Sequence, residues 1–471
     1  MAQTFFFYDL ETSGLNPRQD RIMQFAGQRT DMNLEPIGEP YNLLVTLNDD
    51  TLPSPDALMV TGITPQKTVE EGYTEAQFAR MLSEEIFTPD TIAVGFNNIR
   101  FDDEFIRHLL WRNFHDPYEW SWKDGRSRWD LLDVVRLTRA LRPEGINWPL
   151  DAKGEPSNRL ELITSANGIA HENAHDALAD VTALIAVTKL IKQKQPQLYD
   201  YLLKMRDKKV VQQLVNVDDK KPFVYASGRY DKEFAKTTVA FPLTTSRNGG
   251  VVVYDLRYDP TPFVGLSAEE LSAKIFASWE ERQAEDFVKL PVKELQYNRC
   301  PAVAPLGVLE QGDGWRKISL SAEVVRQHQH ILLNHPDFAE KLRTIFENKP
   351  AFKKLPDPEA QLYDGFLNNR DRIRVEAVRN ADERELADFH PEFQDERLAP
   401  LLLHYKARNF PRSLSEDDLV QWEAWRSQHL QAQLPQFMAS LQRLASTATD
   451  EQQFILQELQ LWAEAVLPSS D

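Results

Sequence analysis

The sequence contains very little cysteine and no long apolar run. Its 471 residues include one cysteine, Cys300, so an intrachain disulfide is excluded, and no Cys/His cluster offers a structural zinc site. No stretch approaches the roughly 20 consecutive apolar residues that span a bilayer, and the first residues lack the basic and apolar segments of an export signal. These absences predict a protein of the reducing cytoplasm, without a membrane anchor.

Positive charge is also scarce. The chain has 54 Lys and Arg against 72 Asp and Glu, a net charge of −18. This balance argues against general electrostatic binding of nucleic acid but permits a local basic groove, so a polyanionic ligand would have to be met by metal ions and local patches. Residues 189–209 and 397–412 are the two basic stretches, and a solvated helix face is the alternative interpretation of the first.

The remaining composition is that of a globular protein, with 42% hydrophobic and 27% charged residues. At roughly 150 residues per domain, the length predicts about three domains. Residues 1–195 mix strand and helix patterns, which predicts an α/β domain. Residues 196–350 contain short β-rich runs and predict a mainly β domain, and residues 355–471 have an almost wholly helical pattern. Prolines at 196, 350, 356 and 358 mark the two boundaries.

Hydrophobic periodicity predicts individual elements within these three parts. Strands are expected at residues 5–8, 22–29, 41–47 and 91–97, and helices at 74–87, 102–114, 129–141 and 177–191. The second part is expected to hold strands at 237–241 and 251–256 on either side of the turn signal Asn248-Gly249-Gly250, and the third to hold helices at 419–434 and 452–466.

Two carboxylates stand two positions apart at the end of the first predicted strand, in the run Asp9-Leu10-Glu11-Thr12-Ser13-Gly14. Side chains at positions i and i+2 of a strand share a face, so both carboxylates can point at one site. Such a pair suits a hard divalent cation. Taken alone the pattern is weak, because two solvated carboxylates at a strand end are the commoner explanation.

Two further acidic motifs follow predicted strands or begin predicted helices. Asp102 follows the strand at 91–97, and an ordinary N-cap is its alternative role. Asp180 stands on the helix at 177–191, with His175 five positions earlier. Because five residues turn a helix by about 140°, the two can share a site only if His175 lies in the preceding loop. A surface histidine is the plainer interpretation of His175 alone.

In this order and on these elements, the three motifs resemble the DEDDh exonucleases, whose site is built from four acids and a histidine. The related subgroup has tyrosine four positions before the last aspartate, where this chain has Asp176. Residues 101–104, 127–134, 141–149 and 407–411 also look like the bacterial exodeoxyribonuclease I family. That resemblance implies a ribonuclease H-like exonuclease domain, an SH3-like β domain and an α-helical carboxy-terminal domain.

The resemblance also implies a chemistry and a set of site residues. It implies a processive 3′-to-5′ exonuclease that degrades single-stranded DNA to nucleoside 5′-monophosphates in DNA repair and recombination, with two Mg²⁺ ions or Mn²⁺ as cofactor. Asp9 would bridge the metals, Glu11 and Asp180 would complete one metal, Asp102 would hold the other, and His175 would be the general base. His171 is a competing base, and the motif spacing favours His175. The substrate-binding residues expected are Leu10, Glu11, Thr12, Trp129 and Arg408. For Trp129, a core position is the alternative.

The resemblance further implies a partner, the acidic carboxy-terminal tail of the single-stranded DNA-binding protein. Such a tail requires a basic residue beside an apolar notch, and Arg142 with Tyr201 is the expected pair. The alternative is that Arg142 caps the helix before it. A monomer is expected. Two other functions stay open, an RNA 3′-exonuclease of the same superfamily and a nucleic-acid-binding scaffold without turnover.

Overall fold

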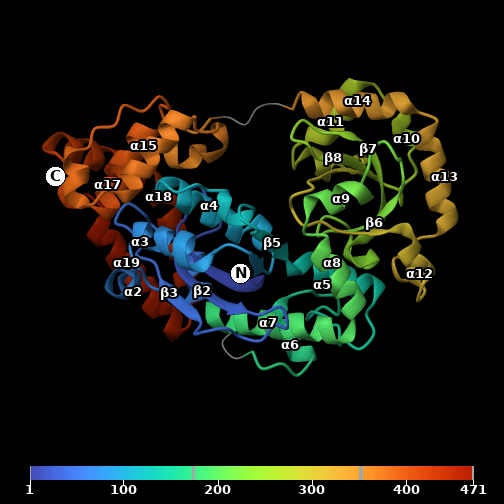
Figure 1. Cartoon of the computed structure of the whole chain (residues 1–471), viewed down its shortest axis with the longest axis horizontal. Helices are drawn as coiled ribbons and strands as arrows, with labels where there is room; N and C mark the ends of the chain where they lie inside the picture. The colour runs from blue at the N-terminus through green and yellow to red at the C-terminus, as the bar shows by residue number, and fades with distance from the viewer. Residues whose placement is uncertain (1, 172–175, 350–353, 469–471) are drawn as a thin grey trace. The chain divides into compact units, whose positions relative to one another are not determined.

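The computed structural model describes residues 2–171, 176–349 and 354–468 (Figure 1). It forms two compact units, each assembled from separate stretches of the chain. Unit one comprises Met1–Arg128, His171–Ile185 and Lys353–Asp471, and unit two comprises Trp129–Ala170 and Ala186–Phe352. Because these units group the chain by spatial contact, they do not test the three consecutive domains expected from the sequence, and that division stays a prediction.

The strands of the amino-terminal part, within residues 4–130, form a five-stranded mixed sheet in the order β3-β2-β1-β4-β5. The central strand β1 (Thr4–Thr12) pairs antiparallel with β2 (Ile22–Thr30) and parallel with β4 (Thr91–Gly95), and β2 pairs antiparallel with β3 (Tyr41–Leu44). Strands β1, β2 and β4 are almost wholly buried. The α/β class predicted for this part is confirmed, and its central strand is the one that carries Asp9 and Glu11.

The sequence pattern misses one strand of this sheet. Residues 129–141 were expected to form a single helix, but β5 (Ser127–Asp130) comes first and α5 (Leu131–Leu141) follows it. The side chain of Asp130 accepts a hydrogen bond from the Leu132 amide and caps the helix, so the helix begins after Asp130. The expected helix at 74–87 is α3 (Glu75–Met81), which continues as a wider π-type turn over Leu82–Ile86.

The carboxy-terminal helices share a core with this sheet inside unit one. Met23 and Leu47 from the amino-terminal region pack in one buried cluster with Leu430, Phe437 and Leu459. In Figure 1, α19 runs beside α2, and the two helices are in contact. The helices predicted near 419–434 and 452–466 are therefore confirmed as parts of one packed body. The other helices of unit one are α1 (Pro55–Thr61), α2 (Pro65–Glu71), α4 (Asp102–Arg112), α15 (Asn369–Asn380), α16 (Glu383–Asp388), α17 (Leu398–Asn409), α18 (Glu416–Ala445) and α19 (Asp450–Val466), and α7 (Ala177–Lys194) begins there.

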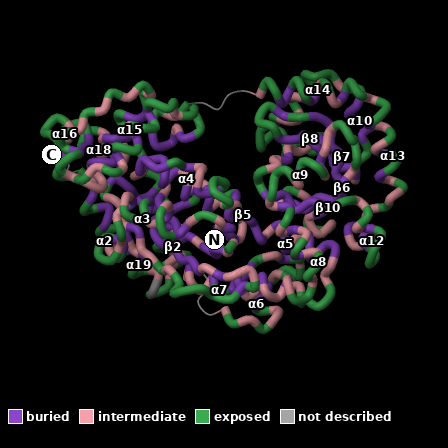
Figure 2. Tube along the Cα trace, in the orientation of Figure 1, coloured by how far each residue is buried: buried purple, intermediate pink, exposed green. Residues whose placement is uncertain are grey.

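Unit two is built on a second five-stranded sheet, in the order β10-β6-β7-β8-β9 with antiparallel pairing throughout. Its strands are β6 (Phe223–Ala226), β7 (Thr237–Thr245), β8 (Val251–Asp255), β9 (Val292–Leu295) and β10 (Ala302–Pro305). The β-rich middle part is thus confirmed, including the turn between β7 and β8, where Gly249 adopts a φ of +71°. Figure 2 shows that the buried residues of this unit concentrate in the strands.

Helices also cover the second sheet, and α14 packs on β7 and against α11. Helix α5 also contacts β6, β7 and β10. The other helices of unit two are α6 (Leu160–Ala166), α8 (Pro196–Lys204), α9 (Lys208–Leu214), α10 (Thr261–Val264), α11 (Ala268–Phe276), α12 (Gly314–Lys317), α13 (Ala322–Leu333) and α14 (Pro336–Glu347). Within the described stretches, none of the helices combines the length and the apolar character that crossing a membrane requires.

Candidate active site

Three carboxylates from two separate elements meet beside the central strand. Asp9 and Glu11 lie on the same side of β1, as the two-residue repeat of a strand requires, and Asp180 comes from the first turn of α7. One oxygen from each of the three lies within 4.8 Å of the others. The pairing register of β1 and β2 shifts between Glu11 and Thr12, so the strand is irregular where the acidic pair ends.

Asp102 is the fourth acid, at the start of α4. It is the first residue of that helix and is buried, with 5% of its surface exposed. Phe101, not Asp102, occupies the N-cap position, and no side chain caps the helix there, so the N-cap role considered for Asp102 is wrong. The charge of Asp102 acts on both strand acids, because it raises the pKa of Asp9 and of Glu11.

The environment of these acids opposes their ionisation. Burial, followed by the charges of Asp102, Glu11 and Asp180, raises the pKa of Asp9 well above its usual range. Burial and the neighbouring acids, Asp180 first, raise the pKa of Glu11 to about 8. A cluster of carboxylates held at such close range fits a divalent cation, whose charge relieves the repulsion and which prefers oxygen ligands.

The residues next to Asp9 and Asp102 are bonded to each other. The Tyr8 hydroxyl donates a hydrogen bond to Asp103, and Arg128 Nη1 reaches the other oxygen of Asp103 at 2.5 Å. This contact ties β1 to the start of α4 one residue away from each acid. The sequence motifs contain Asp103, which was expected only as a first-turn acid of the helix, and Arg128. They did not predict the contact of these residues with each other or with Tyr8.

The third motif is described only in part. Asp176 accepts a hydrogen bond from the Ala179 amide at 3.1 Å and caps α7, which fixes the turn that carries Asp180. His171 Nε2 lies 2.6 Å from Asp180 Oδ1. His175, the predicted base, lies outside the described residues, so its role stays a prediction. The contact of His171 with Asp180 was not foreseen from the spacing of the motif.

The residues predicted to bind substrate have other partners in the structure. Leu10 lies in a buried hydrophobic cluster, and Thr12 donates a hydrogen bond to the Gly14 carbonyl at 2.7 Å. Trp129 is 1% exposed and packs edge-on against Tyr199. Arg408 is 2% exposed and is paired with acids of unit one. These substrate contacts therefore stay predictions, and burial leaves Trp129 and Arg408 little surface to offer a ligand.

The two basic stretches differ in exposure. In residues 397–412, Arg397 and Lys406 are buried and pair with Asp395 and Asp418, so most of that charge is used inside the protein. In residues 189–209 the basic side chains are half-buried or exposed; they are Lys189, Lys192, Lys194, Lys204, Arg206, Lys208 and Lys209. Residues 189–209 are therefore the better candidate for contact with a polyanion.

Arg142 and Tyr201, the predicted partner-binding pair, both contact the segment around β10 in unit two. Arg142 follows the last residue of α5 and donates to the Leu141 carbonyl at 2.8 Å, which is the capping role considered as its alternative. It also reaches the Val308 carbonyl at 3.4 Å, and the Tyr201 hydroxyl donates to the Val303 carbonyl at 3.0 Å. Both side chains are half-buried, so part of each remains accessible.

Known proteins are similar to nearly the whole chain. Three family models match it: Exonuclease over residues 6–188, Exonuclease I SH3-like domain over 206–348, and Exonuclease I C-terminal domain over 356–466. The exodeoxyribonuclease I of Haemophilus influenzae is 40% identical over 95% of this chain and 95% of its own length. Escherichia coli exonuclease I in complex with a dA16 oligonucleotide is similar with a TM-score of 0.94 and 38% identity, covering 99% of this chain and 100% of that one. A structure of SSB/exonuclease I with an inhibitor matches with a TM-score of 0.89 and 37% identity, covering 99% and 100%.

The raised pKa of Glu11 predicts a pH-dependent stability of the metal-free protein. The pKa is about 8 in the folded state against 4.5 for the free side chain, so the folded state retains a proton that the unfolded state loses. Stability is therefore lost as the pH rises from about 4.5 to about 8. We expect Glu11→Gln to raise the melting temperature by roughly 2 to 4 °C at pH 8 and by much less at pH 5, measured by calorimetry with a chelator present. The exposed Glu70→Gln is the matched control, and an equal shift at both pH values would contradict the prediction.

Proposed function

The chain belongs to the exodeoxyribonuclease I family and is a nuclease, and from that premise we propose that it degrades single-stranded DNA from the 3′ end to nucleoside 5′-monophosphates. The observation that carries the proposal is the meeting of Asp9, Glu11 and Asp180 within 4.8 Å, in a site whose burial opposes the charges of Asp9 and Glu11. A scaffold that only binds nucleic acid has no need for such a cluster. We further propose that it works processively, in the cytoplasm, in DNA repair and recombination.

The site would hold divalent cations, and we propose two Mg²⁺ ions, with Mn²⁺ as an alternative. The donors would all be carboxylates, Asp9, Glu11, Asp102 and Asp180. The raised pKa values of Asp9 and Glu11 show that positive charge would stabilise the ionised site, and a cation supplies it. When bound, such ions activate water and neutralise charge on the departing oxygen of a phosphodiester. The DEDDh exonucleases use divalent metals, in agreement with this donor set.

The protein groups then have separate tasks. The four carboxylates would hold the cations, and their negative charge would keep competing anions out of the site. We propose that His175 accepts the proton of the attacking water, because an imidazole with a pKa near 6.5 can do so at neutral pH. His171, bonded to Asp180 at 2.6 Å, orients that carboxylate. Leu10, Glu11, Thr12, Trp129 and Arg408 remain the proposed substrate-binding residues, and the last two are buried in this structure.

We also propose that the chain acts as a monomer and binds the acidic tail of the single-stranded DNA-binding protein. The related exonuclease I described with SSB supports the partner. On this chain, Arg142 supplies a half-exposed positive charge and Tyr201 a half-exposed ring in the same unit. A tail carboxylate would compete with the Leu141 and Val308 carbonyls for the guanidinium, and a charged acceptor forms the stronger hydrogen bond.

The proposed reaction is tested with matched DNA and RNA oligonucleotides labelled at either end, with and without Mg²⁺. We expect release of 5′-monophosphates from the 3′ end of DNA only when Mg²⁺ is present. Asp9→Ala should lower turnover by several orders of magnitude without unfolding the protein, because a metal ligand is lost and no core residue is removed. Equal degradation of RNA would favour the RNA exonuclease, and a wild type without turnover would favour the binding scaffold.

The two histidines are distinguished by a pair of glutamine variants. His175→Gln should lower turnover by roughly 10² to 10⁴ fold because the proton acceptor is lost. His171→Gln should lower it by at most about tenfold, because glutamine can still donate a hydrogen bond to Asp180. Single-turnover rates across pH 6 to 9 provide the measurement. If His171→Gln had the larger effect, the assignment of the base would be reversed.

The partner site is tested by titrating the tail peptide of the single-stranded DNA-binding protein at low salt, where the charge contribution is largest. Arg142→Ala should weaken binding roughly tenfold or more, since a charge-assisted hydrogen bond is lost. The exposed Arg282→Ala, in the same unit, is the control and should bind like the wild type. Unchanged affinity in Arg142→Ala would place the binding site elsewhere.

A further inference from the structure

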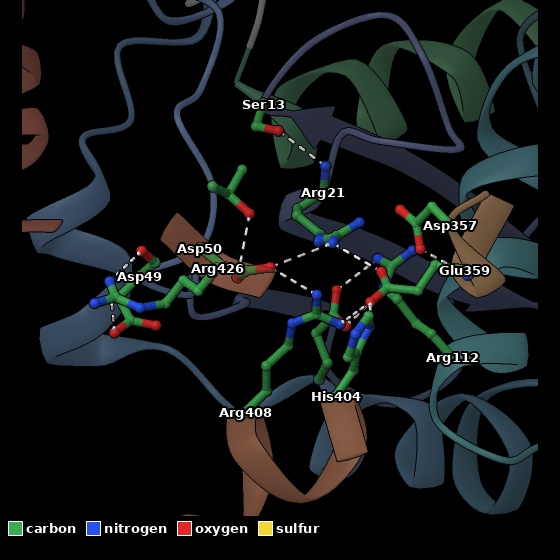
Figure 3. Close-up of polar contacts among 12 residues, drawn as sticks. Ser13, Arg21, Asp49, Asp50, Arg112, Asp357, Glu359, His404, Arg408 and Arg426 are labelled. Carbon is green, nitrogen blue, oxygen red and sulfur yellow. Dashed lines mark hydrogen bonds and ion pairs between the residues drawn. The ribbon is translucent and has the colours of Figure 1, made fainter. Parts of the chain in front are cut away.

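Unit one contains a second group of charged residues, which shares no member with the four acids and is almost closed to solvent. We call Arg21, Asp50, Glu359, His404 and Arg408 the buried ion cluster, and each of these side chains is at most 3% exposed. Figure 3 shows them converging from the loop before β2, the loop after β3, the segment before α15, and α17. The cluster therefore joins the amino-terminal and carboxy-terminal regions of the chain by charge.

Glu359 stands at the centre of this cluster. Its Oε2 accepts a hydrogen bond from Arg21 Nη2 at 2.9 Å, and its Oε1 is contacted by Arg408 Nη1 at 2.6 Å and by His404 Nδ1 at 2.8 Å. Asp357, Glu359 and His404 have the donor types of a metal site. The oxygens of Glu359 are already occupied by guanidinium and imidazole groups, so these contacts describe an internal ion pair network.

The charges of the cluster balance one another. Burial by itself would raise the pKa of Glu359, but Arg408 and Arg21 outweigh it and hold that pKa well below its usual range. Burial likewise opposes the ionisation of Asp50, and Arg408 and Arg21 again lower the pKa. Both acids are therefore ionised at neutral pH. Removing one partner of such a buried pair leaves a charge without its counterion, which is costly.

Arg21 connects this cluster to the acidic motif through its main chain. The Ser13 amide donates to the Arg21 carbonyl at 2.8 Å, and the Arg21 amide donates to Ser13 Oγ at 2.8 Å. Ser13 is two residues after Glu11, and the Ser54 amide in turn donates to the Ser13 carbonyl at 2.7 Å. The turn between Ser13 and Arg21 is therefore closed at the point where β1 delivers Glu11 to the site.

The side chain of Arg21 is held through one of its three nitrogen atoms, Nη2. Among the residues that the structure describes, Nε and Nη1 of Arg21 have no hydrogen-bond acceptor, although both atoms are buried. Nη2 bonds to Glu359 and lies 3.8 Å from Asp50 Oδ2, which is too long for a hydrogen bond. Glu359, 338 positions away in the sequence, is thus the group that fixes the Arg21 guanidinium.

We infer that Arg21 and Glu359 are positioning residues for the acidic site: Glu359 fixes Arg21, and Arg21 closes the turn that sets the position of Glu11. The inference deepens the proposed function and rests on it for its effect on turnover. In this account the carboxy-terminal region, through Glu359, helps to position the acids of the site, in addition to any contact that it makes with DNA.

The test uses the full-length protein and two readouts, amide hydrogen exchange without metal or substrate, and steady-state hydrolysis of a short oligonucleotide with Mg²⁺. Glu359→Gln should lower the protection of the amides of residues 13 and 21 by tenfold or more. It should lower turnover by roughly 10 to 100 fold with less than a threefold change in KM, at a temperature where the variant is folded. Arg21→Lys, which keeps the charge, should recover part of the turnover relative to Arg21→Met.

The double variant Arg21→Met with Glu359→Gln separates positioning from stability. It removes one positive and one negative charge, so the net charge of the cluster is again zero, but the contact between residues 21 and 359 is still absent. We expect its melting temperature to recover toward that of the wild type, with amide protection and turnover still low. Recovery of turnover together with stability would overturn the inference.

The matched control is Arg443→Gln. Arg443 contacts Asp56 at 2.6 Å and joins the same two regions of the chain, but both side chains are at least half-exposed. This variant should resemble the wild type in both readouts. Wild-type protection of residues 13 and 21 in Glu359→Gln would overturn the inference whatever the activity, whereas a wild-type protein without nuclease activity would overturn the proposed function alone.

Discussion

The repulsion among four carboxylates is the constraint on which the candidate site depends. Asp9, Glu11, Asp102 and Asp180 come from one strand and two helices, and burial together with the neighbouring acids opposes the ionisation of Asp9 and Glu11. The raised pKa values of Asp9 and Glu11 mean that keeping these acids ionised and close together lowers the stability of the folded protein. This loss is offset when a cation enters, because the site then gains charge neutralisation and the cation gains its preferred oxygen ligands.

Acids that repel one another stay close only if the elements that carry them are fixed. Two sets of contacts serve this purpose. The bond from Tyr8 to Asp103, supported by Arg128, joins β1 to the start of α4. The main-chain bonds between Ser13 and Arg21 close the turn after Glu11, and the guanidinium of Arg21 is held by Glu359. In both cases the group that fixes the acid is itself a buried, paired charge.

The packing of unit one gives the carboxy-terminal helices a structural role. Leu430, Phe437 and Leu459 complete a core whose other half is formed by Met23 and Leu47. A chain that ended after residue 195 would expose this core and leave Arg21 and Asp50 without Glu359 and Arg408. Such a truncation would remove contacts that support the site together with any DNA contact of the carboxy-terminal region, so it would not test processivity alone. Point variants on the surface of the full-length chain would change DNA contacts and leave the core and the ion cluster in place.

The sequence determined the chemistry of this protein and the order of its parts. The alternation of β1 placed Asp9 and Glu11 on one face, the period of α7 placed Asp180 in its first turn, and the turn at Asn248-Gly249-Gly250 joined two strands, because all of these depend on local spacing. Such patterns cannot specify contacts between residues hundreds of positions apart. The partnership of Arg21 with Glu359, the burial of Arg408 and Trp129, and the contact of His171 with Asp180 were decided by tertiary packing. A basic or aromatic side chain looks the same in a sequence whether it faces solvent or lies inside the protein. Only the fold supplies the counterion of a buried arginine or the ring that packs against a buried tryptophan.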